Sequence, residues 1–121
     1  MPHDERLAER VRKALLGTRG LRERRMFGGV AFLLRGNMCC GVARDLLVLR
    51  LGPEGAEAGL QRAHTRPMDF TGRPMRGMLY VEPEGIRTAA SLRQWLGQAV
   101  QFAMGLPERP AKGAGPASRK K

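Results

Sequence analysis

Residues 30–51 read VAFLLRGNMCCGVARDLLVLRL, which is three short apolar runs separated by two turn signals. The runs cover residues 30–34, 38–43 and 46–51, with Gly36-Asn37 and Arg44-Asp45 between them. Short apolar runs joined by tight polar turns are typical of strands that pair with their sequence neighbours. The stretch therefore predicts a three-stranded antiparallel meander.

Segments with helical periodicity lie on both sides of the meander. Between about Asp4 and Leu16 the apolar residues recur on one face, which predicts an amphipathic helix with Asp4 as its N-cap. A short helix is expected over residues 54–63, and Pro67 closes it. A last helix is expected over residues 89–104, where Gly105 and Pro107 end it. Residues 67–77 are rich in Gly and Pro and predict a loop, and Met78–Val81 predicts a strand.

The predicted order is helix, three strands, helix, one or two strands, helix. Strands grouped together with helices between the groups indicate an α+β fold. We expect two layers, an antiparallel sheet with the helices packed on one face, because that arrangement buries the apolar stripes. The domain is expected to cover residues 1–106, and residues 107–121 are expected to form a basic, disordered tail.

The formal net charge of +11 is high for 121 residues. Such a charge favours association with nucleic acid, acidic proteins or anionic membranes, without selecting one of them. The first residues carry no export signal, and no apolar stretch is long enough to suggest a membrane span. The only two cysteines are adjacent, which excludes a disulfide framework and predicts a cytoplasmic protein.

Motifs with possible chemistry are weak. Gly72 and Gly77 have the spacing of a phosphate-binding loop, but Met78 stands where that motif needs Lys and a strand follows. Cys39 and Cys40 lie in a predicted strand, so their side chains are expected on opposite faces, unable to hold one metal ion. We therefore predict neither a metal nor a cofactor.

A cysteine nucleophile with His64 as base and Asp69 as orienting group is the enzyme alternative. The residue types alone do not place these groups together, and a buried cysteine that packs as a small apolar residue is the more common state.

Two further features are open to a functional or a structural interpretation. Arg22, Arg24 and Arg25 either contact phosphates of nucleic acid or belong to a solvated connector, which is the simpler interpretation. The segment Met26-Phe27-Gly28-Gly29 either presents an apolar patch to a partner or fills the core between the first helix and the sheet.

Several segments taken together point to a known family. They are Met26-Phe27-Gly28-Gly29, Gly36–Val42, Leu49-Arg50, Phe70-Thr-Gly-Arg-Pro-Met-Arg-Gly-Met-Leu-Tyr-Val81, the helix with Leu92 and Trp95, and Leu106-Pro107. In this combination the chain resembles the N-terminal domain of the TfoX/Sxy competence-regulator family, over roughly residues 4–110. The resemblance implies a two-layer α+β fold with helix, three strands, helix, two strands, helix, and no catalytic residues. It also implies a stand-alone version of the domain, because full regulators carry a second, helical domain.

The resemblance further implies a bacterial, non-catalytic module of transcription regulation that binds a protein partner or a second copy of itself. The partner-binding residues expected on this basis are Met26, Phe27, Gly28, Gly29, Phe70, Thr71, Gly72, Arg73, Pro74, Met75 and Gly77. The alternative is weakly specific binding of nucleic acid through the basic face and tail. That alternative uses Arg22, Arg24, Arg25, Arg119, Lys120 and Lys121.

Overall fold

The computed structural model describes residues 4–26, 28–70 and 73–108. Its strands are β1 (Leu21–Met26), β2 (Gly29–Leu34), β3 (Asn37–Ala43), β4 (Leu46–Arg50), β5 (Thr65–Phe70) and β6 (Arg73–Val81). Its helices are α1 (Glu5–Ala14), α2 (Gly52–Gly59), the 3-10 helix η1 (Pro83–Ile86) and α3 (Ala89–Met104). None of the described helices is long and apolar enough to cross a membrane.

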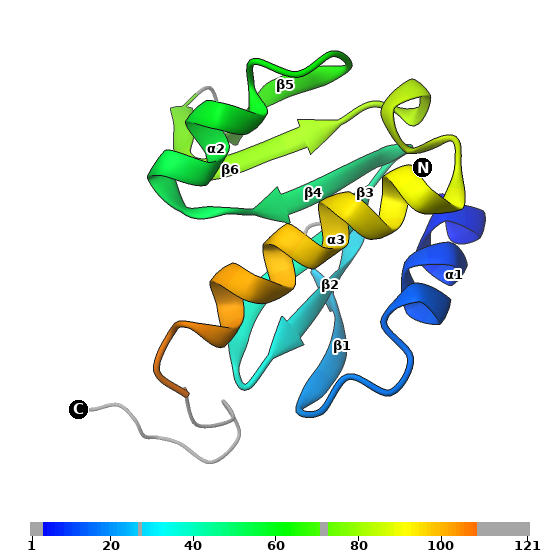
Figure 1. Ribbon diagram of the computed structural model, residues 1–121. Coiled ribbons are helices and arrows are strands. Elements are labelled where there is room, and N and C mark those ends of the chain that lie inside the picture. Colours follow the sequence, from blue (N-terminus) through cyan, green and yellow to red (C-terminus); the bar gives the residue numbers. More distant parts are fainter. Residues whose placement is uncertain (1–3, 27, 71–72, 109–121) are drawn as a thin grey trace.

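The six strands form one antiparallel sheet in the order β1-β2-β3-β4-β6-β5. The predicted meander is β2-β3-β4, and the apolar runs and turns of residues 30–51 account for it. Figure 1 shows α3 crossing the sheet diagonally, with α1 beside it and α2 over β6. The predicted α+β fold, with a sheet covered by helices on one face, is confirmed.

The core lies between the sheet and the helices. Val30, Val42, Leu47 and Val81 lie next to one another across β2, β3, β4 and β6, and all four are buried. Trp95 of α3 is 1% exposed and packs into the same cluster. A second row of buried side chains, Phe32, Cys40, Leu49 and Leu79, runs parallel to the first.

Two segments have more strand than the sequence predicts. Residues 21–26 pair with β2 over their whole length, so they form a strand and not a connector, although Arg22, Arg24 and Arg25 are exposed to solvent as that interpretation expected. Residues 65–70 and 73–81 form a hairpin, although their Gly and Pro content predicted a loop up to Gly77. Pro67 is tolerated there because β5 is an edge strand, where a missing backbone N–H does not break the sheet.

The helices end close to the predicted residues. Asp4 is the N-cap of α1 as predicted, since its Oδ1 accepts hydrogen bonds from two backbone N–H groups of the first turn, at 2.9 and 3.2 Å. The range 89–104 of α3 is also as predicted. By contrast, α2 begins at Gly52 and ends at Gly59, two residues before the expected start and four residues before the expected end.

Cys39 and Cys40 both lie in the core, which corrects the expectation that they face opposite sides of the sheet. Phe32 pairs with Cys40, whereas the next residue, Leu33, pairs with Met38, so β3 has one extra residue at Cys39. Such a bulge changes the alternation of side chains along a strand.

Candidate functional site

The basic cluster of the sequence lies on β1, at one edge of the sheet. Arg22, Arg24 and Arg25 are exposed. Glu23, between them, forms an ion pair with Arg12 of α1, with 2.6 Å between Nη2 and Oε2, so Glu23 faces the helices. Because successive side chains of a strand point to opposite faces, Arg22 and Arg24 lie on the face away from the helices.

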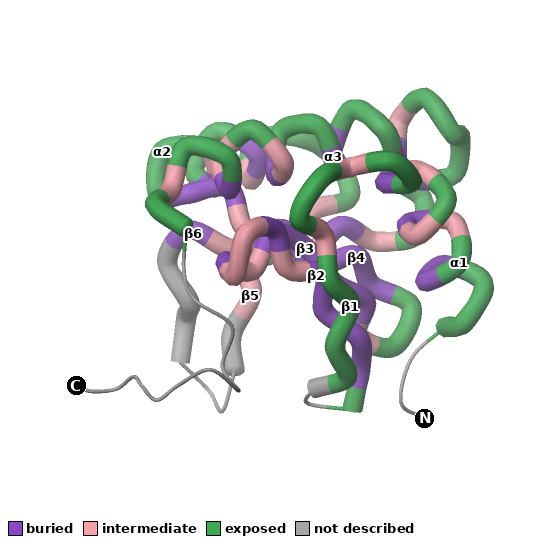
Figure 2. Tube along the Cα trace, turned by 90° about the horizontal axis from the view of Figure 1, so that it is seen from below, coloured by how far each residue is buried: buried purple, intermediate pink, exposed green. Residues whose placement is uncertain are grey.

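The same alternation places residues of the other strands on this face. Arg24 pairs with Ala31 of β2, Val48 of β4 pairs with Tyr80 of β6, and Tyr80 pairs with Arg66 of β5. Figure 2 shows α2 and α3 on one side of the strands, and the alternation places these residues on the other side. We call this surface the open face. It consists of Arg22, Arg24, Ala31, Leu33, Val48, Arg66, Met78 and Tyr80.

The open face has a half-buried apolar middle with arginines at its two sides. Leu33, Met78 and Tyr80 are half-buried, whereas Ala31 and Val48 between them are buried. On the β5 side, Arg66 lies over the ring of Tyr80, with 5.8 Å between Cζ and the ring centroid. Its Nε also lies 3.2 Å from Oε2 of Glu82, which directly follows β6. Among the described residues, no acidic side chain forms an ion pair with Arg22 or Arg24 on the β1 side.

The two motif segments expected to bind a partner lie in different hairpins. Residues 26–29 connect β1 to β2 at one edge of the sheet, and residues 70–77 belong to the β5–β6 hairpin at the other edge. The first turn lies at the Val81 end of β6, whereas the second turn lies at its opposite end. The hairpin turns therefore lie at opposite corners of the sheet, with the open face between them.

Two of the motif glycines have a packing role. A Cβ on Gly29 would lie 2.2 Å from the carbonyl oxygen of Val42, which is closer than any side chain tolerates. Gly77 has a φ of +84°, and a Cβ there would lie 3.3 Å from the backbone of Gly52. Gly28 is exposed and has no such neighbour. Glycine is needed at position 29 because β2 lies close to β3, and at position 77 because β6 lies close to the start of α2. Neither glycine therefore needs a binding partner to explain it.

For the other predicted site residues, the structure describes either nothing or only the backbone. Phe27, Thr71, Gly72, Arg119, Lys120 and Lys121 are not among the described residues, and for Met26, Phe70, Arg73, Pro74 and Met75 only the backbone is described. Their roles remain predictions.

Comparison with protein families identifies the chain. The model of the TfoX N-terminal domain matches residues 13–103, from within α1 to the end of α3 and including both motif hairpins. This chain belongs to the TfoX N-terminal domain family. Neither the curated proteins nor the solved structures contain a significant match to it.

The cysteines of this TfoX N-terminal domain give no support to a catalytic thiol. Cys39 and Cys40 are both completely buried. The neighbouring Cys39 and burial raise the pKa of the Cys40 thiol, whereas the interaction with Cys40 lowers the pKa of Cys39. The proposed base, His64, is exposed and lies beside two glutamates.

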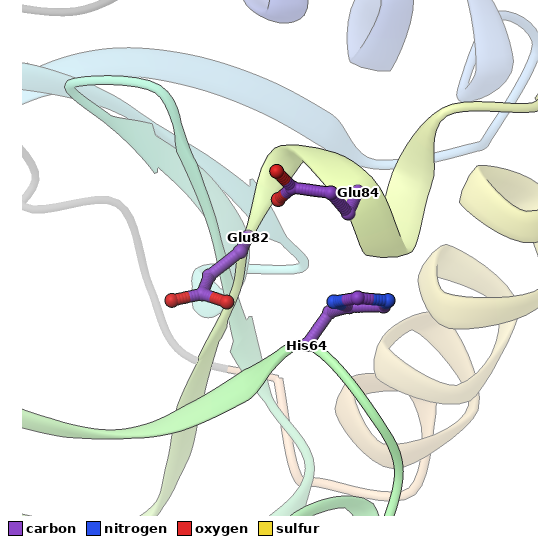
Figure 3. Close-up of side chains that lie close together, drawn as sticks. All are labelled: His64, Glu82 and Glu84. Atoms are coloured by element: carbon purple, nitrogen blue, oxygen red, sulfur yellow. The ribbon is translucent and has the colours of Figure 1, made fainter.

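A group of metal-ligating side chains in the domain was not predicted. His64 precedes β5, Glu82 follows β6, and Glu84 lies in η1. One ligand atom from each lies within 4.8 Å of the other two, and Figure 3 shows the three side chains gathered around one point. Sequence spacing gives no signal for this group, because His64 is far along the chain from both glutamates. Pairing of β5 with β6 brings them together.

Proposed function

We propose that this TfoX N-terminal domain is a non-catalytic module of transcription regulation that binds an acidic protein partner through the open face. The observation that carries the proposal is the composition of that face. Arginine, methionine and aromatic residues are the types enriched where proteins bind one another. Here Arg22 and Arg24 lie at the β1 edge and Arg66 lies at the β5 edge, with Met78 and Tyr80 on β6 between the two edges.

The charge of the open face supports an acidic partner. Glu82, which directly follows β6, is the acidic residue beside the open face, and its carboxylate already forms an ion pair with Arg66. The exposed Arg22 and Arg24 remain available for carboxylates, to which a guanidinium binds through two parallel hydrogen bonds. Complementary charge mainly increases the rate and specificity of association, so binding should weaken with added salt.

Membership of the family supports a regulatory role. The cytoplasm is the proposed location, since both cysteines are free and buried in the core. The resemblance to the TfoX/Sxy competence regulators is what suggests a role in competence, and the charge of the open face is what suggests an acidic partner.

Capture of partners from the native cell tests the proposal. The double variant Arg22→Ser, Arg24→Ser should lose a partner that the unchanged protein retains at low salt. Arg93→Ser is the matched control, because Arg93 is exposed on α3, in the helix layer. Equal capture by both variants, with unchanged thermal stability, would contradict the role of the open face.

Direct binding of nucleic acid is the second candidate, and the net charge of +11 favours it. The open face offers only Tyr80 for base stacking, and Arg66 already lies over that ring. Binding of a labelled DNA duplex at two salt concentrations separates the candidates. DNA affinity that falls with salt and requires Arg22 and Arg24 would replace the protein partner by nucleic acid.

A further inference from the structure

His64 is held in position by the backbone and by a neighbouring glycine. Its carbonyl oxygen accepts a hydrogen bond of 2.8 Å from the N–H of Glu82, which fixes the start of β5 to the end of β6. Its φ of 67° lies in the left-handed region, where residues other than glycine are uncommon. A Cβ on Gly85 would lie 3.2 Å from Cβ of His64 and 2.7 Å from Cγ1 of Val81. Glycine at position 85 therefore gives the imidazole room beside η1.

The glutamates bring two negative charges to this imidazole. Glu82 is oriented by Arg66, with 3.2 Å between Nε and Oε2. Within residues 4–26, 28–70 and 73–108, Glu84 has no ion-pair partner, although it lies beside the carboxylate of Glu82. Two adjacent carboxylates repel each other unless a cation lies between them. The cluster therefore has an unbalanced negative charge directed at one point.

The ligand types and their spacing fit a divalent transition metal. One imidazole nitrogen with carboxylate oxygens is a set used by Zn²⁺, which binds each ligand at about 2.0–2.2 Å. Tetrahedral ligands at that distance lie roughly 3.3 Å from one another. The ligand atoms here lie within 4.8 Å of one another. Side-chain rotations of Glu84 and His64 that move their ligand atoms by about 1.5 Å close the set around Glu82.

We propose that His64, Glu82 and Glu84 bind one divalent ion of the zinc class at the junction of β5, β6 and η1. Three protein ligands leave a coordination position for water, because the cluster lies at the surface. Arg66 supports the site by holding Glu82 in place. The bound ion would link the start of β5 to the β6–η1 segment and remove the negative charge beside the open face.

Calorimetric titration of the full chain with Zn²⁺ alone, with thiols kept reduced, tests this site. We expect one ion per chain, and an affinity at least about tenfold weaker in His64→Asn and in Glu84→Gln. Asparagine suits the test because it tolerates the left-handed backbone at position 64. Glu57→Gln is the control, because Glu57 is an exposed acid of α2, away from the cluster.

His3→Asn is a second control, since His3 is the only other histidine in the chain. It should leave Zn²⁺ binding unchanged and allow the imidazole signals of His64 to be assigned by nuclear magnetic resonance. Those signals should shift on addition of Zn²⁺. The melting temperature should rise with Zn²⁺ in the wild-type chain, in Glu57→Gln and in His3→Asn, but not in His64→Asn or Glu84→Gln. No binding, or binding that survives His64→Asn or is lost in His3→Asn, would overturn the proposal.

Discussion

Gly29→Ala tests the contact between β2 and β3 at the motif Met26–Gly29. The new methyl group would lie 2.2 Å from the carbonyl oxygen of Val42 and 3.4 Å from Cα of Ala43. An unstrained contact between these atoms is about 3.3 Å, so the strands must move apart by about 1 Å. Gly29 does not have a positive φ, so alanine causes no backbone strain there, and any loss of stability comes from this contact. Forcing one carbon into a closed space costs about 1–3 kcal/mol.

Urea and thermal unfolding measure this cost. At about 2 kcal/mol, the melting temperature should fall by roughly 8 °C in a domain of this size. Gly97→Ala is the matched control, because a Cβ on Gly97, within α3, has no neighbour within 4 Å. That variant should be more stable than the wild type by about 0.5–1 kcal/mol, since alanine favours a helix over glycine. Unchanged stability in Gly29→Ala would refute the close approach of β2 to β3.

Three further predictions concern the helices and the core. Asp4→Ala should lower the free energy of unfolding by about 1 kcal/mol in urea titrations, because the first turn of α1 loses its cap; no change would show that water replaces the cap. Arg62→Ala should cost about 0.5–1 kcal/mol, as Cζ of Arg62 lies 4.0 Å from the ring centroid of Trp95, and increased quenching of Trp95 fluorescence by iodide would show the uncovered ring. Alkylation of Cys39 and Cys40 should be slow at neutral pH, and fast labelling would revive the catalytic thiol. Because the pKa of Cys40 is raised in the folded state, the folded state should lose stability as pH rises above about 8.5, the ordinary value of a thiol in an unfolded chain.

The parts of the fold that follow from sequence are those with a buried face. Residues 30–51 and 89–104 carry apolar residues at the period of the strands and the helix they form. Residues 21–26, LRERRM, have charged residues at all four middle positions, so they lack the apolar alternation that predicts a strand. They can still form one because an edge strand needs little apolar burial. The same reason explains the β5–β6 hairpin, in which Pro67 lies at an edge and the sequence predicted a loop.

The candidate sites could likewise be predicted only in part from the sequence. Sequence alone pointed to Arg22 and Arg24, but only the ion pair of Glu23 with Arg12 shows which face they occupy. The grouping of His64 with two glutamates depends on strand pairing between distant segments, which no local spacing encodes. The bulge at Cys39 depends on the register between β2 and β3 and has no signature in the residues.

Site-specific photo-crosslinking tests most directly whether the open face binds the partner. A photoreactive amino acid is placed at position 24, on the open face, or at position 93, on the exposed side of α3, and each protein is irradiated in the native cell. The account predicts a covalent adduct with one acidic protein at position 24, absent at position 93 and absent at position 24 after Arg22→Ser. An adduct at position 93 alone, or one at position 24 with nucleic acid in place of protein, would contradict it.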